Sequence, residues 1–163
     1  MNSPLRFAQL AASESGNALI ELALSLPLFL ILILGTAEIA NLAWASVQVN
    51  NAARAAAAYA SQSRTNAAPS NIANITLAAQ NEAPKLANLQ VKNYNELCSC
   101  VGTDGSSPSI ACDSSALSNC PFPGTIQVAV KVNTQAAVTP IVHYPGLPAT
   151  YTVNAQATMG VAQ

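Results

Sequence analysis

The chain has 163 residues, of which 51% are hydrophobic and 8% are charged, and its formal net charge is −1. This length allows one membrane helix and one small domain. Six basic residues against seven acidic ones leave no excess of positive charge, which argues against a nucleic-acid partner.

The first 15 residues show no helical periodicity, and an apolar stretch without charges follows from Leu22 to Ala37. As a helix these 16 residues would rise about 24 Å, slightly less than the roughly 30 Å hydrocarbon layer. Extension to Trp44 gives about 35 Å, includes Glu38 and places an aromatic residue at an interface. The pattern predicts a membrane-spanning helix that is kinked at Pro27.

A carboxylate lies at the start of this helix. Glu21 follows Gly16 and Asn17, and a charge near hydrocarbon is costly enough to indicate a function and a partner. Alternatively, Glu21 is an interfacial residue that favours the positive end of the helix dipole, worth about 0.3 to 1 kcal/mol. Helical spacing places Glu21, Ser25 and Gly35 on one small or polar face, which would pack against neighbouring helices or face lipid.

These residues carry a resemblance to a known family. A polar leader, Gly16, Glu21 five residues later and an apolar helix resemble the processing and assembly signal of type IV pilin-like proteins. The ordered continuation through Pro27, Gly35 and the segment 49–60 is similar to the TadE-like family, whose members are minor pilins or pseudopilins of the tight-adherence (Tad or Flp) pilus machinery. The resemblance implies cleavage by a prepilin peptidase between Gly16 and Asn17, and assembly through Glu21.

The resemblance also implies partners and a location. The partners would be the prepilin peptidase, other pilin and pseudopilin subunits, the membrane proteins of the Tad secretion platform and the lipid bilayer. The protein would lie in the bacterial inner membrane with one pass, a cytoplasmic N-terminus and a periplasmic domain, and it could enter a surface pilus. We expect a leader over 1–16, a transmembrane and extended helix over 17–60, and an α+β domain over 61–163.

Two alternatives stay open. An uncleaved, membrane-anchored assembly or adhesion factor would need only the helix and would keep Met1. Ordinary signal peptidase could instead cut after Ala43-Trp44-Ala45 and release a secreted binding domain that starts at Ser46.

Beyond the membrane the pattern predicts a helix on an antiparallel sheet. A stripe at helical spacing continues the first helix and would lie on the domain; it consists of Ala45, Val49, Ala52, Ala56 and Tyr59 or Ala60. The segment from Pro69 to Glu82 is expected to form a second helix with Ile72, Ile75 and Ala79 on one face. Apolar residues then alternate in three predicted strands. Their inward positions include Leu89 and Val91; Ile126, Val128, Val130 and Val132; and Tyr151, Val153, Ala155, Ala157 and Met159. The segment 136–149, which is rich in Pro and Gly, is expected to be a loop or a broken edge strand.

The four cysteines are Cys98, Cys100, Cys112 and Cys120. Their spacing suits zinc poorly and no histidine is near, so in an exported domain we expect two disulfides that staple a loop. Three pairings are possible. We expect the nested one, Cys100 with Cys112 and Cys98 with Cys120, because Cys98 and Cys100 would leave a strand on the same side at different depths.

Residues for catalysis are sparse. The single histidine, His143, lies in a proline-rich segment, and Asp104 and Asp113 lack the ligand-dense spacing of a calcium loop. No phosphate-binding or nucleophile motif is present. We therefore expect no enzymatic activity, no bound metal and no cofactor.

Overall fold

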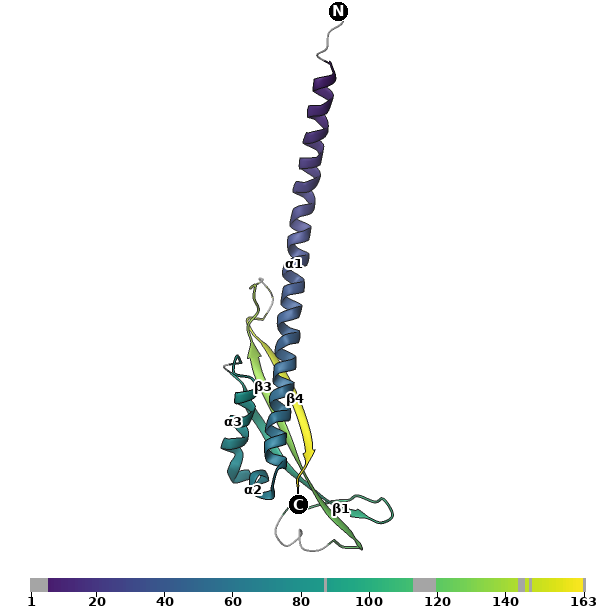
Figure 1. Cartoon of the computed structure of the whole chain (residues 1–163), viewed down its shortest axis with the longest axis vertical. Helices are drawn as coiled ribbons and strands as arrows, with labels where there is room; N and C mark the ends of the chain where they lie inside the picture. The colour runs from purple at the N-terminus through teal and green to yellow at the C-terminus, as the bar shows by residue number, and fades with distance from the viewer. Residues whose placement is uncertain (1–5, 87, 113–119, 144–145, 147, 163) are drawn as a thin grey trace, which may run out of the picture. The chain divides into compact units, whose positions relative to one another are not determined.

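A computed structural model describes residues 6–86, 88–112, 120–143, 146 and 148–162, with side chains from residue 16 onward (Figure 1). Its helices are α1 (Arg6–Ser61), α2 (Arg64–Ala67), the 3₁₀ helix η1 (Pro69–Asn71) and α3 (Ile72–Glu82). Its strands are β1 (Gln90–Gly102), β2 (Ser109–Ile110), β3 (Gly124–Val138) and β4 (Tyr151–Gly160). The chain divides into two compact units, Met1–Asn41 and Leu42–Gln163, which are described separately. The predicted fold class, a long apolar helix followed by a helix-on-antiparallel-sheet domain, is confirmed.

Helix α1 is longer than its apolar part. It begins at Arg6, although the segment before Gly16 shows no helical periodicity, and it is continuous through Pro27. Proline removes the main-chain bond to the carbonyl four residues earlier, which is that of Ala23. The Ser25 hydroxyl, a possible substitute donor for this carbonyl, instead donates to the Leu22 carbonyl at 3.2 Å.

In the second unit, the last turns of α1 form the centre of the core. Seven residues of α1 have no exposed surface: Ala45, Val49, Ala52, Ala53, Ala56, Ala57 and Ala60. The predicted stripe is therefore confirmed, and it is wider than expected because Ala53 and Ala57 belong to it. Alanine side chains let the helix backbone approach the sheet closely, and the hydroxyl of the buried Thr134 in β3 donates to the Val49 carbonyl at 2.9 Å.

The short helices begin and end where local chemistry predicts. Ser63 caps α2, since its hydroxyl accepts from the Asn66 amide at 3.1 Å. The predicted helix up to Glu82 is confirmed as η1 followed by α3, with Ile75 and Ala79 buried. Ile72, on the same predicted face, keeps 38% of its surface exposed.

The four strands form one antiparallel sheet in the order β2-β1-β3-β4 (Figure 1). Strand β1 contains a bulge: Val91 pairs with Thr134 and Asn93 with Asn133, so Lys92 has no partner in the register. A bulge shifts the alternation of faces by one residue. Leu89 is therefore buried before the bulge, and Cys98 and Cys100 are buried after it.

Two strand predictions need correction. Strand β3 extends to Val138, with alternate residues buried from Val128 onward, so the first part of the expected loop at 136–149 belongs to a central strand. The two-residue strand β2 was not predicted, because it has no periodicity of its own and forms only by pairing with Cys98 and Ser99.

Candidate membrane-assembly site

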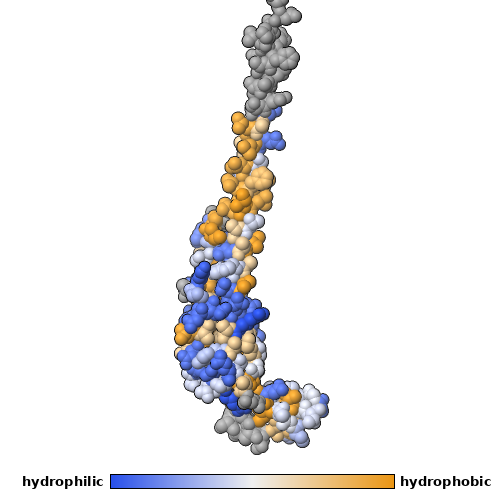
Figure 2. Space-filling model, viewed as in Figure 1, coloured by the Kyte–Doolittle hydropathy of each residue, from blue (hydrophilic) through white to orange (hydrophobic). Residues whose placement is uncertain are grey.

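The first unit exposes an apolar helical surface. Every large hydrophobic residue between Leu19 and Ile39 is exposed, and the exposed fraction ranges from 39% at Leu34 to 77% at Leu24. Figure 2 shows these residues as an orange band along the helix. So much apolar area in water is unfavourable and marks an interaction surface. The helical stretch from Gly16 to Ser61 has the length and hydropathy of a membrane anchor or of a signal sequence.

The predicted assembly residues lie on this open surface. Glu21 is exposed in the first part of the apolar helix, and Ser25 is half-buried one turn later. A Cβ atom built on Gly35 would meet no other atom within 4 Å. The small and polar face that helical spacing predicts therefore carries no contact at Gly35 from the described residues, and another helix has room to approach it.

The predicted processing site lies within a helix. Gly16 and Asn17 are both exposed, and a Cβ atom on Gly16 would also meet nothing within 4 Å. Because α1 begins at Arg6, the peptide bond between them is part of a continuous helix and not of a flexible segment before it. A protease would have access to this bond, but it would have to unwind a turn of helix to bind the chain in an extended form.

The two disulfides form in the predicted region with a different pairing. Cys98 joins Cys112 and Cys100 joins Cys120, with Cα–Cα distances of 5.4 and 5.6 Å. The expected nested pairing is wrong. Pairing of Cys98 with Ile110 brings the chain back beside β1, so Cys112 arrives next to Cys98 and leaves Cys100 for Cys120, just before β3.

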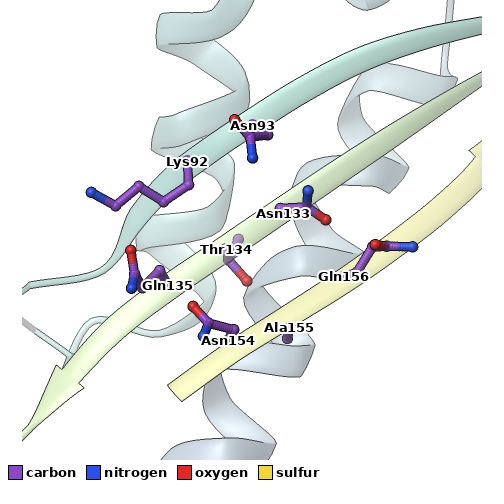
Figure 3. Close-up of a pocket in the computed structure, with 8 residues that line it drawn as sticks. All are labelled: Lys92, Asn93, Asn133, Thr134, Gln135, Asn154, Ala155 and Gln156. Atoms are coloured by element: carbon purple, nitrogen blue, oxygen red, sulfur yellow. The ribbon is translucent and has the colours of Figure 1, made fainter. Parts of the chain in front are cut away.

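Amide side chains form two rows across the outer face of the sheet, and Figure 3 shows them except for Gln90. The strand registers align Asn93, Asn133 and Gln156 in one row, and Gln90, Gln135 and Asn154 in the next. Most of these residues, together with Lys92, line a shallow groove of about 610 Å³ that contains no carboxylate. In the alternation of each strand, these positions form only the polar half. The recurrence of Asn and Gln at alternate positions was the signal that could have revealed them as a group.

The remaining candidate groups do not converge. His143 is exposed, and the Asp104 carboxylate accepts hydrogen bonds from the Ser106 hydroxyl and amide at 2.6 and 3.0 Å. These hydrogen bonds lower the pKa of the Asp104 carboxyl and close a local turn. Asp113 lies outside the described residues. Within the described ranges, no three His, Cys, Asp or Glu side chains come together in a way that could hold a metal ion.

These features define a class of protein with one exposed apolar N-terminal helix and a small, disulfide-containing α+β domain. Residues 16–58, which include the apolar helix, match the model of the TadE-like protein family. The resemblance carried by Gly16, Glu21 and the following helix is thereby confirmed. TadE-like proteins are associated with the Tad pilus and are generally non-catalytic components of it. No curated protein and no solved structure shows significant similarity to the chain.

Proposed function

We propose that this protein is a minor pilin, or pseudopilin, of a Tad/Flp pilus assembly machinery. The observation that carries the proposal is an apolar helix with its side chains exposed, preceded by Gly16 and Glu21, within the segment that matches the TadE-like family. The helix spans the bacterial inner membrane, with a cytoplasmic N-terminus and the domain over 61–163 on the periplasmic side. The protein contributes to adherence through helix-helix contacts with other pilin subunits.

Processing and assembly are linked through two charges. Cleavage by prepilin peptidase between Gly16 and Asn17 would create a positively charged amine one helical turn before Glu21. A lone carboxylate at the membrane boundary is costly in a low dielectric, and the amine of a neighbouring subunit within a few ångströms offsets that cost. Glu21 thus favours insertion of the helix beside another subunit over its isolation in lipid.

The test is to neutralise Glu21 without changing its size. Glu21→Gln protein should still insert and still be cut, so its N-terminal residue should be Asn17, while the amount of pilus sheared from the cell surface falls to background. Glu82→Gln, which neutralises an exposed carboxylate on α3, is the matched control and should leave pilus output unchanged. Gly16→Leu should block cleavage itself. Wild-type pilus output from a processed Glu21→Gln protein would refute the role of Glu21.

A second candidate is the permanently anchored assembly or adhesion factor. The continuous helix through Gly16 favours it, because the bond that would be cut is not presented in a loop. The N-terminal residue of the membrane-bound protein separates the candidates. Asn17 supports the processed pilin and Met1 supports the anchored factor, whereas Ser46 on a soluble domain would indicate release by signal peptidase.

A further inference from the structure

Strand β4 lies at one end of the sheet, and within the described part of the chain it pairs only with β3 (Figure 1). Its outward main-chain groups follow from the register. The Val161 amide donates to the Val128 carbonyl at 2.7 Å, so the odd-numbered residues of β4 direct their N–H and C=O groups toward β3. The main-chain groups that point to the open side of β4 therefore belong to Thr152, Asn154, Gln156 and Thr158.

Among the described residues, none of the usual features that protect a sheet edge from pairing occurs on β4, whereas the opposite side of the sheet has several. Natural sheets protect edges with charges, prolines, bulges or a covering segment. Strand β1 has the bulge at Lys92, the charge of Glu96, and the short β2 over Cys98 and Ser99. The ten residues of β4, YTVNAQATMG, include no charge, no proline and no register shift against β3.

The two faces of β4 specify the kind of strand that would fit. Its inner face presents Tyr151, Val153, Ala155 and Met159, which are only half-buried at the margin of the core. On its outer face, Asn154 and Gln156 end the two amide rows (Figure 3). An added strand would cover the apolar margin with small or apolar side chains and extend the rows with Thr, Asn or Gln. An uncharged segment that alternates apolar and polar residues fits both faces.

A second copy of this chain is a less suitable partner for the β4 edge. The reason depends on the proposed anchoring of the protein in a membrane. Antiparallel pairing of two β4 strands relates the copies by a two-fold axis across the strands. Residues 42–61 of α1 pack on the sheet, so this axis would reverse the direction of that segment in the second copy. The Leu42 ends of the two copies would then point in opposite directions, which disfavours anchoring of both copies in one bilayer.

We propose that the open edge of β4 is a docking site for an extended, uncharged segment of another polypeptide, which adds to the sheet as a fifth strand. Main-chain hydrogen bonds to Thr152, Asn154, Gln156 and Thr158 hold the segment, and the alternation of its side chains selects it. This site is separate from the helix contacts through Glu21. One subunit can therefore contact a neighbouring helix within the membrane and an extended segment outside it.

The probe is a synthetic, capped peptide with the sequence of β4, residues 151–160, and it lacks the helix that disfavours self-pairing of the whole chain. In the antiparallel register that places Ala155 of the peptide opposite Ala155 of the protein, Asn154 of the peptide faces Gln156 of the protein and Thr152 of the peptide faces Thr158 of the protein. The main-chain groups that point outward from β4 then meet those of the peptide. Fluorescence anisotropy of the labelled peptide with full-length protein in nanodiscs should show saturable binding. A scrambled peptide is the first control.

Selective N-methylation of the peptide provides a matched pair that leaves the protein unchanged. Methyl groups on Asn154 and Gln156 of the peptide block the bonds toward β4 and should weaken binding about tenfold or more, since two main-chain hydrogen bonds are lost. Methyl groups on Val153 and Ala155 block only amides that face away and should change affinity by less than about threefold. Asn133→Ala protein, altered in the same amide row but away from the edge, should bind like wild type.

Three results would overturn the proposal. The first is equal affinity of the two methylated peptides, or no saturable binding. The second is slow hydrogen exchange of the Thr152, Asn154, Gln156 and Thr158 amides in monomeric protein alone, which would mean that its own chain covers the edge. The third is a dimer in nanodiscs with these amides protected, which would make a second copy the occupant. Peptide binding requires neither cleavage nor pilus output, so its failure is distinct from failure of the proposed function.

Discussion

Replacing the cysteines two at a time with serine tests which of them are joined by disulfide bonds. Removing Cys98 together with Cys112, as the double Cys→Ser variant, should leave the second bridge intact, and removing Cys100 together with Cys120 should leave the first. Mass spectrometry after alkylation without reduction should then find no free thiol in either variant. The mismatched variant, Cys98→Ser with Cys120→Ser, leaves two cysteines that the structure does not join, and it should show two free thiols.

The expected size of the effect follows from the loops that the bridges close. Their sequence separations are 14 and 20 residues. The chain-entropy relation gives about 3 kcal/mol of stabilisation for each loop at 25 °C. Domains are stable by roughly 5 to 15 kcal/mol, so loss of one bridge should leave a folded domain that unfolds at lower urea concentration. Because the two loops overlap, loss of both should cost less than the sum.

Urea unfolding of the full-length protein in nanodiscs, followed by near-ultraviolet circular dichroism, measures these differences. Each matched variant should lose about 3 kcal/mol, and the mismatched variant should lose more because both native bridges are absent. Zero free thiols in the mismatched variant, together with a loss of only about 3 kcal/mol, would show that the native pairing joins Cys100 to Cys112. That result would refute the argument that pairing of β2 with β1 selects the partner of Cys98.

Two further predictions concern the contacts between the sheet and the helices. Thr134→Val removes the hydrogen bond to the Val49 carbonyl while keeping the side-chain volume, and it should lower the free energy of unfolding by about 1 kcal/mol; an unchanged urea midpoint would contradict this. Burial, together with the nearby Glu96 carboxylate, raises the pKa of Tyr94, whose hydroxyl donates to the Ala67 carbonyl, from 10.0 to about 12. The folded state then holds this proton more tightly, so the stability contribution of Tyr94 is complete below pH 10 and is lost as pH rises toward about 12. The difference in unfolding free energy between wild type and Tyr94→Phe should therefore shrink over that range. A constant difference would contradict this prediction.

The elements that the sequence predicts well depend on neighbours in the chain. The apolar run of α1, the alanine stripe on its last turns and the alternation in β3 and β4 each repeat with the period of one regular structure. The helix before Pro84 also follows from a local rule, since a residue that precedes proline, here Ala83, disfavours helical backbone. Gly16, Asn17 and Glu21 could likewise be selected from their order alone, and their roles stay predictions.

Other features depend on residues far apart in the chain, and the sequence alone misjudged them. Strand alternation placed Cys98 and Cys100 on one face, which is correct, but their partners were decided by where β2 returns along β1. The bulge at Lys92 ended the predicted alternation early, because the extra residue is defined only by its pairing with β3. The difference in burial between Ile72 and Ile75, which share one helical face, was likewise not predictable, because the position of the sheet decides which side of a short helix is covered.

The sequence by itself thus determined the apolar helix, the similarity of that helix to the TadE-like family and the periods of the main strands, because these are properties of consecutive residues. The tertiary structure alone decided the disulfide pairing, the two amide rows and the open edge of β4. Each of these depends on the order in which strands pair, and strand order is set by contacts between segments separated by tens of residues.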